Sequence, residues 1–231
     1  MSKVIGILGG MGPLATADLF KKIIENTPAV IEQEHLRIIV YNNPKIPSRI
    51  EAILKGKSSP LPEMKKSALV LENAGADFII IPCHTAHNWI TELRETVKIP
   101  IYSFIEITTS FIKENYPLLS DKIMLLASEA TVKQKLYQNA FGNLDFIIRI
   151  PSPDHQKIIS SAVNEVKAGR LESNPWQEQL NAVINHYRTS GISAVLGGCT
   201  EIPLLFPHLD SKIEKLDATM IMARKAVALA K

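Results

Sequence analysis

The chain contains two cysteines, and each one ends the same kind of phrase. Cys83 follows Gly75 by eight residues, and Cys199 follows Gly191 by eight residues. Between each glycine and its cysteine lies an apolar run of strand length, and a threonine comes shortly after each thiol. Because the 231-residue chain has no further cysteine, this repetition favours a role for the two thiols as a pair.

Two thiols can invert a carbon centre when they act on the same substrate. A thiol at the start of a helix has a lowered pKa, because backbone N–H groups and the helix dipole stabilise the thiolate. One thiolate then removes a proton from carbon while the other thiol delivers a proton to the opposite face. Free cysteine is also among the most buried residue types, so burial alone explains either cysteine taken singly. The matched phrases favour function for both together.

Hydrophobic periodicity predicts the elements that position these phrases. Short runs rich in Ile and Val alternate with longer amphipathic stretches, which predicts an α/β fold with mainly parallel sheets covered by helices. The predicted strands are Val4–Leu8, Leu36–Tyr41, Phe78–Ile81, Ile99–Tyr102, Ile123–Ala127, Leu144–Arg149 and Ala194–Leu196. The predicted helices are Pro13–Asn26, Pro62–Ala74, Thr85–Thr96, Ile105–Asn115, Glu129–Ala140, Asp154–Ala168, Pro175–Ser190 and Asp217–Ala230.

The second half of the chain repeats the element order of the first half. The two glycines and the two cysteines of the matched phrases share the same offset along the chain. We therefore predict two similar lobes related by a pseudo-twofold axis, one formed by residues 1–103 with 211–231 and the other by residues 104–210. Ligands of parallel α/β sheets bind beyond the carboxyl ends of the strands. Both cysteines fall there, so we expect a cleft between the lobes that is flanked by the two thiols.

A glycine-rich turn follows the first predicted strand. Gly10, Gly12 and Ala15 fit the pattern G-x-G-x-x-A, which is typical of dinucleotide sites. Such a site needs an acidic residue at the end of the second strand, and this strand ends at Tyr41 followed by two asparagines. A plain strand-to-helix turn, or a turn whose amides bind a small carboxylate, is therefore favoured over a dinucleotide site.

Metal and phosphatase sites are weaker interpretations of the cysteine phrases. Cys83, His84, His87 and Cys199 are residue types that zinc accepts, but no carboxylate cluster accompanies them. A cysteine phosphatase needs an arginine six residues after the thiol, where this chain has Trp89 and Leu205 in the two phrases. We expect neither a metal nor another cofactor.

The bulk composition limits the classes of partner. The net charge is +3, and no cluster of Lys and Arg with interleaved aromatic residues is present, so nucleic acid is not predicted. No apolar run approaches the length of a membrane span, and the first residues do not resemble a signal peptide. We expect a cytoplasmic protein with reduced thiols. Arg49, after the second strand, and Lys157, near a helix start, are candidate cations for binding a carboxylate.

Four motifs stand out along the chain: Gly9-Gly-Met-Gly-Pro-Leu-Ala-Thr16, Asn43-Pro-Lys-Ile-Pro-Ser-Arg49, Pro82-Cys-His-Thr-Ala-His87 and Gly197-Gly-Cys-Thr-Glu201. Together they resemble the cofactor-independent aspartate/glutamate racemase family. The resemblance covers essentially the whole chain, and Glu201 makes it most similar to the aspartate racemase branch. It implies a racemase that is independent of pyridoxal phosphate and of metals and that interconverts D- and L-aspartate, or glutamate, by proton transfer between two thiols. It also implies a small-molecule amino-acid substrate and a homodimer.

The resemblance assigns expected roles to individual residues. It implies that Cys83 and Cys199 are the acid/base thiols and that Arg49 and Lys157 hold the side-chain carboxylate of the substrate. Contacts to the substrate are further implied for Met11, Gly12, His84, Thr85, Ser128 and Thr200.

Several positions depart from the pattern of the family. His84 stands where the family usually has asparagine, and an imidazole is larger than an amide and can carry charge. Ser48, Ala130 and Ala218 replace an acid, a glycine and a proline that are common in the family. The residues leave open a related cysteine-dependent isomerase or decarboxylase, such as one acting on maleate or an arylmalonate. A binding protein with an inactive cleft is the non-enzymatic alternative.

Overall fold

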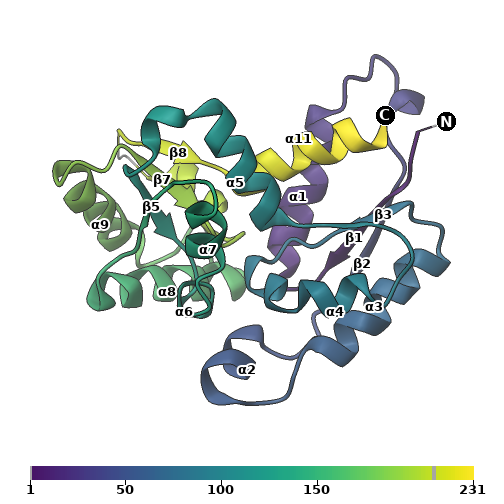
Figure 1. Cartoon of the computed structure of the whole chain (residues 1–231), viewed down its shortest axis with the longest axis horizontal. Helices are drawn as coiled ribbons and strands as arrows, with labels where there is room; N and C mark the ends of the chain where they lie inside the picture. The colour runs from purple at the N-terminus through teal and green to yellow at the C-terminus, as the bar shows by residue number, and fades with distance from the viewer. Residues whose placement is uncertain (1, 210–211) are drawn as a thin grey trace. The chain divides into compact units, whose positions relative to one another are not determined.

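A computed structural model describes residues 2–209 and 212–231 of the chain. The described strands form two sheets of four parallel strands each. The first sheet has the order β2-β1-β3-β4 and the second β6-β5-β7-β8, so both sheets share one topology. Figure 1 labels β1, β2 and β3 of the first sheet and β5, β7 and β8 of the second. The predicted α/β fold with two similar lobes is confirmed. The strands are β1 (Ile5–Gly9), β2 (Ile38–Asn42), β3 (Phe78–Ile80), β4 (Ile101–Tyr102), β5 (Ile123–Leu126), β6 (Ile148–Arg149), β7 (Ala194–Gly197) and β8 (Glu214–Leu216).

Helices follow most of the strands, as expected for crossovers between parallel strands. The α-helices are α1 (Pro13–Asn26), α2 (Arg49–Lys55), α3 (Leu61–Asn73), α4 (Ile90–Arg94), α5 (Phe104–Asn115), α6 (Glu129–Lys133), α7 (Leu136–Gly142), α8 (Pro153–Lys167), α9 (Gln177–Thr189), α10 (Ile202–Leu205) and α11 (Ala218–Ala230). The 3₁₀ turns are η1 (Glu32–Glu34), η2 (His84–Trp89), η3 (Pro117–Leu119) and η4 (Phe206–His208). None of the described helices combines the length and the apolar composition that crossing a membrane requires.

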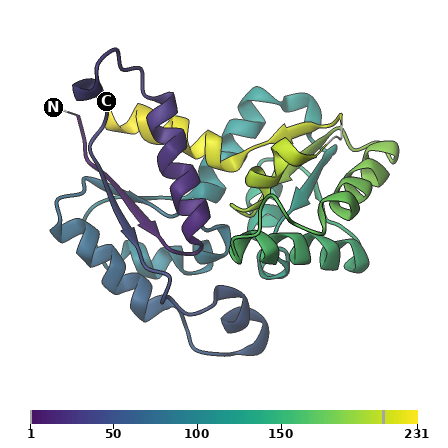
Figure 2. The ribbon, with the colours of Figure 1, turned by 180° about the vertical axis from the view of Figure 1, so that it is seen from behind.

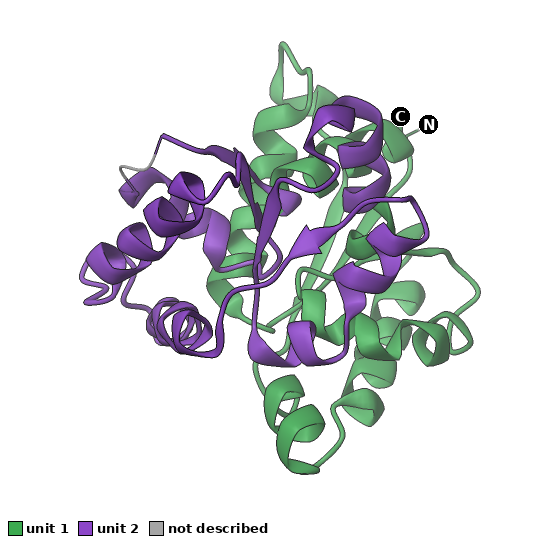
Figure 3. Cartoon of the chain, turned by 60° about the vertical axis from the view of Figure 1, so that its left-hand side comes forward, with its two compact units in different colours: residues 1–107, 219–231 green, residues 108–218 purple. Residues whose placement is uncertain are grey.

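The chain divides into two compact units, coloured separately in Figure 3. Unit 1 comprises residues 1–107 and 219–231, and unit 2 comprises residues 108–218. The sequence placed the first change of lobe after residue 103, whereas the division between the two units falls after residue 107. The second predicted boundary, between residues 210 and 211, lies outside the described residues.

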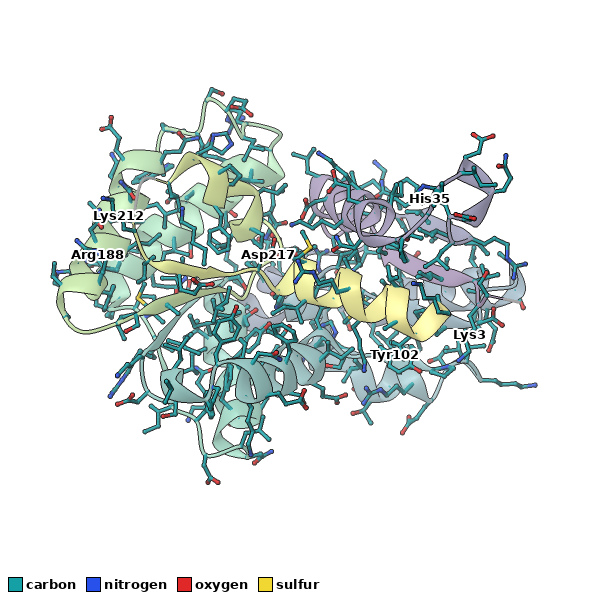
Figure 4. The ribbon with its side chains drawn as sticks, turned by 90° about the horizontal axis from the view of Figure 1, so that it is seen from above. Lys3, His35, Tyr102, Arg188, Lys212 and Asp217 are labelled. Atoms are coloured by element: carbon teal, nitrogen blue, oxygen red, sulfur yellow. The ribbon has the colours of Figure 1, made fainter. Side chains whose placement is uncertain are left out.

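Alternating strand residues of unit 1 pack against helices on two faces of the sheet. Phe78 and Ile80 of β3 join a buried cluster with α1 and α11, whereas Ile79 joins a separate cluster with α3. This alternation follows from the two-residue period of a strand, and burial on both faces explains the nearly continuous apolar runs. Figure 2 shows α1 with α11 beside it, and Figure 4 labels Asp217 just before α11 begins.

Unit 2 is built in the same way around β5 and β7. Met124 and Leu126 of β5 and Val195 of β7 are fully buried in one cluster with side chains of α8 and α9. In both units the strands are therefore held by apolar packing against the helices. This packing also fixes the positions of the loops that follow the strands.

Four elements differ from the sequence prediction, because of irregular backbone geometry or because of a polar sequence. The predicted helix 129–140 is divided into α6 and α7, because Lys135 adopts a left-handed φ of 54°. The predicted strand 144–149 is reduced to β6, because the amides of Leu144 and Phe146 bond back to the carbonyl of Phe141. The edge strand β8 was not predicted, since its Glu-Lys-Leu sequence lacks the apolar run of the other strands. The predicted helix 85–96 begins instead as the 3₁₀ turn η2.

Candidate active site

The two cysteines occupy equivalent positions in the two sheets. Cys83 follows β3 and Cys199 follows β7, and each of these strands is third in its sheet order. The carbonyl of each cysteine accepts a hydrogen bond from the amide three residues later, Ala86 at 3.2 Å and Ile202 at 2.9 Å. Neither cysteine takes part in a disulfide, and both are only 6% exposed. Each matched phrase of the sequence thus forms the same local structure, a strand followed by a turn that begins at the cysteine. We call these two turns the Cys83 corner and the Cys199 corner.

Cys199 has an acidic hydrogen-bond partner. Its Sγ donates to Oε2 of Glu201 at 2.8 Å, and the glutamate is 2% exposed. This hydrogen bond directs the thiol hydrogen of Cys199 toward Glu201 and fixes the orientation of its Sγ atom. The sequence motif included Glu201 only as a mark of similarity to one branch of a family. The missed signal was an acidic residue inside an otherwise apolar turn.

Close packing holds the Cys199 corner in place. A Cβ atom at Gly198 would lie 2.4 Å from Cδ1 of Leu125 and 3.1 Å from the ring of Tyr137, so any larger residue would require the buried Leu125 side chain to move. Tyr137 is fully buried, and burial raises its pKa well above the ordinary value of 10.0. Its phenol therefore stays neutral beside the thiol.

His87 locks the Cys83 corner to the start of α5. Its Nδ1 donates to the carbonyl of Cys83 at 2.9 Å, and its Nε2 accepts from the amide of Phe104 at 3.0 Å. The amide can only donate, so Nε2 carries no proton and the imidazole is neutral with its hydrogen on Nδ1. Both ring nitrogens are thus engaged, which removes His87 from the zinc interpretation. Within residues 2–209 and 212–231, no three His, Cys, Asp or Glu side chains gather as metal ligands would.

His84, the main departure from the racemase pattern, is buried and uncharged. It is 2% exposed and packs edge-on against Phe104, with ring centroids 5.3 Å apart. Burial lowers the pKa of His84 well below 6.5, and the neighbouring His87 lowers it further. The imidazole therefore adds bulk beside Cys83 without adding positive charge at neutral pH.

The buried neutral His87 makes the free energy of unfolding sensitive to acid. Burial lowers its pKa in the folded chain from 6.5 to about 4. Between these pH values the unfolded chain binds more protons, so stability falls as the pH falls. From about pH 7 to about pH 5 we expect His87 to remove about 2 kcal/mol of stability, and His87→Gln to lack this loss. Urea unfolding at both pH values measures the difference.

The control for this experiment is His35→Gln, because His35 lies at an exposed position in the same unit (Figure 4). The comparison uses the change with pH within each variant, so a uniform destabilisation by the glutamine does not affect it. An equal acid-induced loss in wild type and His87→Gln would contradict the neutral, doubly bonded imidazole.

Arg49 is the first residue of α2 and is anchored by backbone carbonyls. Its Nη1 donates to the carbonyls of Ile46 at 3.1 Å and Pro47 at 2.9 Å, and its Nη2 donates to that of Met11 at 3.4 Å. Its Nε is buried without a hydrogen-bond partner. Two of the predicted site residues, Arg49 and Met11, are therefore brought together, and the guanidinium retains a donor for an incoming acceptor.

The glycine turn after β1 is more fully occupied than the sequence suggested. Gly10 has φ of +92°, and a Cβ atom there would lie 2.3 Å from the backbone of Asn43. Its amide donates to Oγ1 of Thr16 at 2.9 Å, and that hydroxyl donates to the carbonyl of Gly12 at 2.9 Å. The expectation that the glycine amides bind a carboxylate is wrong for Gly10, because Thr16 already takes its hydrogen.

The remaining predicted residues lie in different settings. Ser128 is 2% exposed and caps α6, where its Oγ accepts from the amide of Thr131 at 3.3 Å. Thr85 and Thr200 are buried beside the two cysteines. Lys157 is on the surface of α8, with 77% of its side chain exposed, and pairs with Asp154 at 2.9 Å. Lys157 must leave this exposed and weak pair before it can bind a substrate carboxylate.

Several proteins that are similar to this chain are described as racemases. The sequence profile of the family described as Asp/Glu/Hydantoin racemase matches residues 8–226. The broad specificity amino-acid racemase RacX of Bacillus subtilis is 27% identical over 245 aligned residues, which cover 97% of each chain.

Solved structures extend this similarity to the fold. Picrophilus torridus aspartate racemase has a TM-score of 0.88 and 31% identity, covering 99% of this chain and 94% of its own. An aspartate racemase homologue from Pyrococcus horikoshii has a TM-score of 0.77 and 25% identity, covering 100% and 99% of the two chains. The match spans the described parts of both sheets and both cysteine corners. The chain therefore belongs to the Asp/Glu/hydantoin racemase family of enzymes.

Proposed function

We propose that the protein interconverts the enantiomers of an acidic amino acid, preferentially aspartate, by proton transfer between Cys83 and Cys199. The observation that carries the proposal is the equivalent placement of the only two thiols of the chain, one at each third strand. The hydrogen bond from Cys199 to Glu201 supports it, because it gives one of the thiols a buried polar partner that orients it.

In the proposed reaction one thiolate removes the α-proton, and the electron pair of the broken C–H bond remains on the carbon next to the α-carboxylate. The opposite thiol then gives its proton to the other face of that carbon. The first sulfur ends protonated and the second ends as a thiolate, so the two exchange roles for the reverse direction. The reaction requires both thiols to reach one α-carbon, and it needs no oxidant or reductant. Glu201 is proposed to orient the Cys199 thiol through the hydrogen bond that it accepts.

The proposed preference for a substrate with an acidic side chain is based on Arg49, the candidate cation of unit 1. Arg49 has a buried donor without a partner and is fixed by three carbonyls, which suits a carboxylate acceptor. Lys157 is proposed as a second cation, and Thr85, Thr200 and Ser128 are proposed to contact the α-carboxylate. His84 would narrow the space beside Cys83. The similarity to Picrophilus torridus aspartate racemase supports aspartate, whereas that to the Bacillus subtilis enzyme supports a wider range of amino acids.

A panel of amino acids in deuterated water tests the proposal. We expect the α-hydrogen of D- and L-aspartate to be replaced by deuterium, and each enantiomer to approach an equal mixture. Proton NMR measures the exchange, and chiral chromatography measures the inversion. Maleate and phenylmalonate belong in the same panel, because a related isomerase or decarboxylase would consume them. Tight aspartate binding without α-hydrogen exchange would contradict racemisation and favour a binding protein.

A further inference from the structure

Gln156 of α8 has a side-chain amide whose orientation is determined by its partners. Its Nε2 donates to the carbonyl of Ala127 at 2.9 Å and lies 3.2 Å from Oγ of Ser160. A backbone carbonyl can only accept, so the atom facing Ala127 must be the amide nitrogen. The carbonyl oxygen, Oε1, consequently points away from Ala127.

This oxygen is an acceptor that the chain itself leaves unused. Gln156 is 9% exposed, and its Oε1 is buried without a hydrogen-bond partner. Buried polar atoms without a partner are uncommon, and each one lowers stability until a donor reaches it. The sequence contained no signal for this, because a glutamine on an amphipathic helix is usually a surface residue.

The amide is attached to the strand end that neighbours Cys199. Ala127 stands between the last residue of β5 and Ser128, a proposed contact of the substrate. A Cβ atom at Gly198 would lie 3.3 Å from Cβ of Ala127, and the amide of Gly198 donates to the carbonyl of Leu126 at 2.9 Å. Gln156 therefore reaches the carboxyl ends of β5 and β7, where parallel sheets bind their ligands.

We infer that Oε1 of Gln156 accepts a hydrogen bond from the α-ammonium group of the amino-acid substrate. The inference rests on the proposed function, and it follows from the chemistry of the two partners. An amide oxygen only accepts, and both carboxylates of an acidic amino acid only accept, so the ammonium group is the donor that such a substrate offers. The oxygen is covered in the ligand-free chain, so the side chains over it must part when the substrate binds.

Succinate, which is aspartate without its amino group, separates this contact from general damage to the site. In Gln156→Met we expect the KM for aspartate to rise about 10- to 100-fold, as for loss of a hydrogen bond to a charged group. The inhibition constant of succinate should change less than about twofold, since succinate has no ammonium group. Gln156→Glu loses the hydrogen bond to Ala127 but keeps an acceptor oxygen at this position. Because the acceptor remains, aspartate binding should be retained in this variant.

Gln138→Met is the matched control. Gln138 also donates to a backbone carbonyl, that of Val132 at 3.0 Å, and also has a buried Oε1 without a partner. It lies on α7, and we expect its variant to leave the ratio of the aspartate and succinate constants unchanged.

Three results would overturn the inference. One is an equal loss of aspartate and succinate binding in Gln156→Met, which would mean that the amide only supports the strand end or an ordered water. The second is a loss of aspartate binding in Gln156→Glu as large as that in Gln156→Met. The third is a loss of aspartate binding but not of succinate binding in the control variant Gln138→Met. Absence of α-hydrogen exchange in the wild type would contradict the proposed function instead, so the two failures are distinguishable.

Discussion

Replacing either cysteine by alanine is expected to lower the rate of racemisation by roughly 10³-fold or more, because each variant lacks one of the two proton-transfer groups. In Cys83→Ala and Cys199→Ala the remaining thiol can still remove an α-proton, but only from the enantiomer that presents it. The two variants should therefore retain slow deuterium exchange on opposite enantiomers of aspartate. Proton NMR of each pure enantiomer in deuterated water measures this.

The mirror-image pattern distinguishes the two-thiol reaction from chemistry that uses one thiol. An isomerase or decarboxylase with one essential cysteine would lose activity in one variant and keep most of it in the other. Ser67→Ala is the control for loss of a small buried group, since Ser67 is 1% exposed and lies on α3. Thermal unfolding of all three variants separates loss of folding from loss of chemistry. Undiminished racemisation in both cysteine variants would disprove the proposed reaction.

Removing the guanidinium of Arg49 is expected to lower kcat/KM for aspartate roughly 100-fold. The expectation rests on the proposed charge-assisted contact between the part-buried Arg49 and the side-chain carboxylate of the substrate. Arg49→Lys should fall between wild type and Arg49→Met, because an ammonium group keeps the charge but not the planar set of donors. Steady-state racemisation of aspartate measures all three.

Selectivity is the decisive readout for Arg49. Serine and alanine have no side-chain carboxylate, so any activity toward them should fall much less than activity toward aspartate. Arg37→Met is the matched control, because Arg37 is an exposed arginine of the same unit whose Nη2 donates to the carbonyl of Ser2 at 2.7 Å. An equal decrease for aspartate and for the uncharged side chains would show that Arg49 supports the loop rather than the substrate carboxylate.

Much of the fold was predictable because burial on both faces of a parallel sheet requires nearly continuous apolar strands. All five residues of β1 are buried, and α1 has the bounds that its amphipathic pattern predicted. Prediction failed where the backbone leaves regular geometry or where a strand is short and polar. Lys135 interrupts a helical pattern with a positive φ, and β8 pairs with β7 despite a largely polar sequence. These outcomes depend on neighbours that a local pattern does not contain.

The candidate site, like the fold, was predictable only in part. Residue type and spacing were sufficient to place both cysteines at strand ends, because the strand that precedes each thiol is recognisable by itself. The hydrogen-bond partners of the side chains around the two cysteines were not recognisable from the sequence. His87 bonds to Phe104, and Gln156 bonds to Ala127, across separations of 17 and 29 residues that only the packing of elements closes.

The sequence by itself thus determined the α/β class, the repeated lobe and the equivalent positions of the two cysteines, since these follow from periodicity and spacing. Only the tertiary structure decided that His84 is neutral, that Thr16 occupies the amide of Gly10 and that Cys199 bonds to Glu201. The physical reason is that protonation and hydrogen bonding depend on burial and on the direction of a few atoms. Both are set by residues that converge only when the chain has folded.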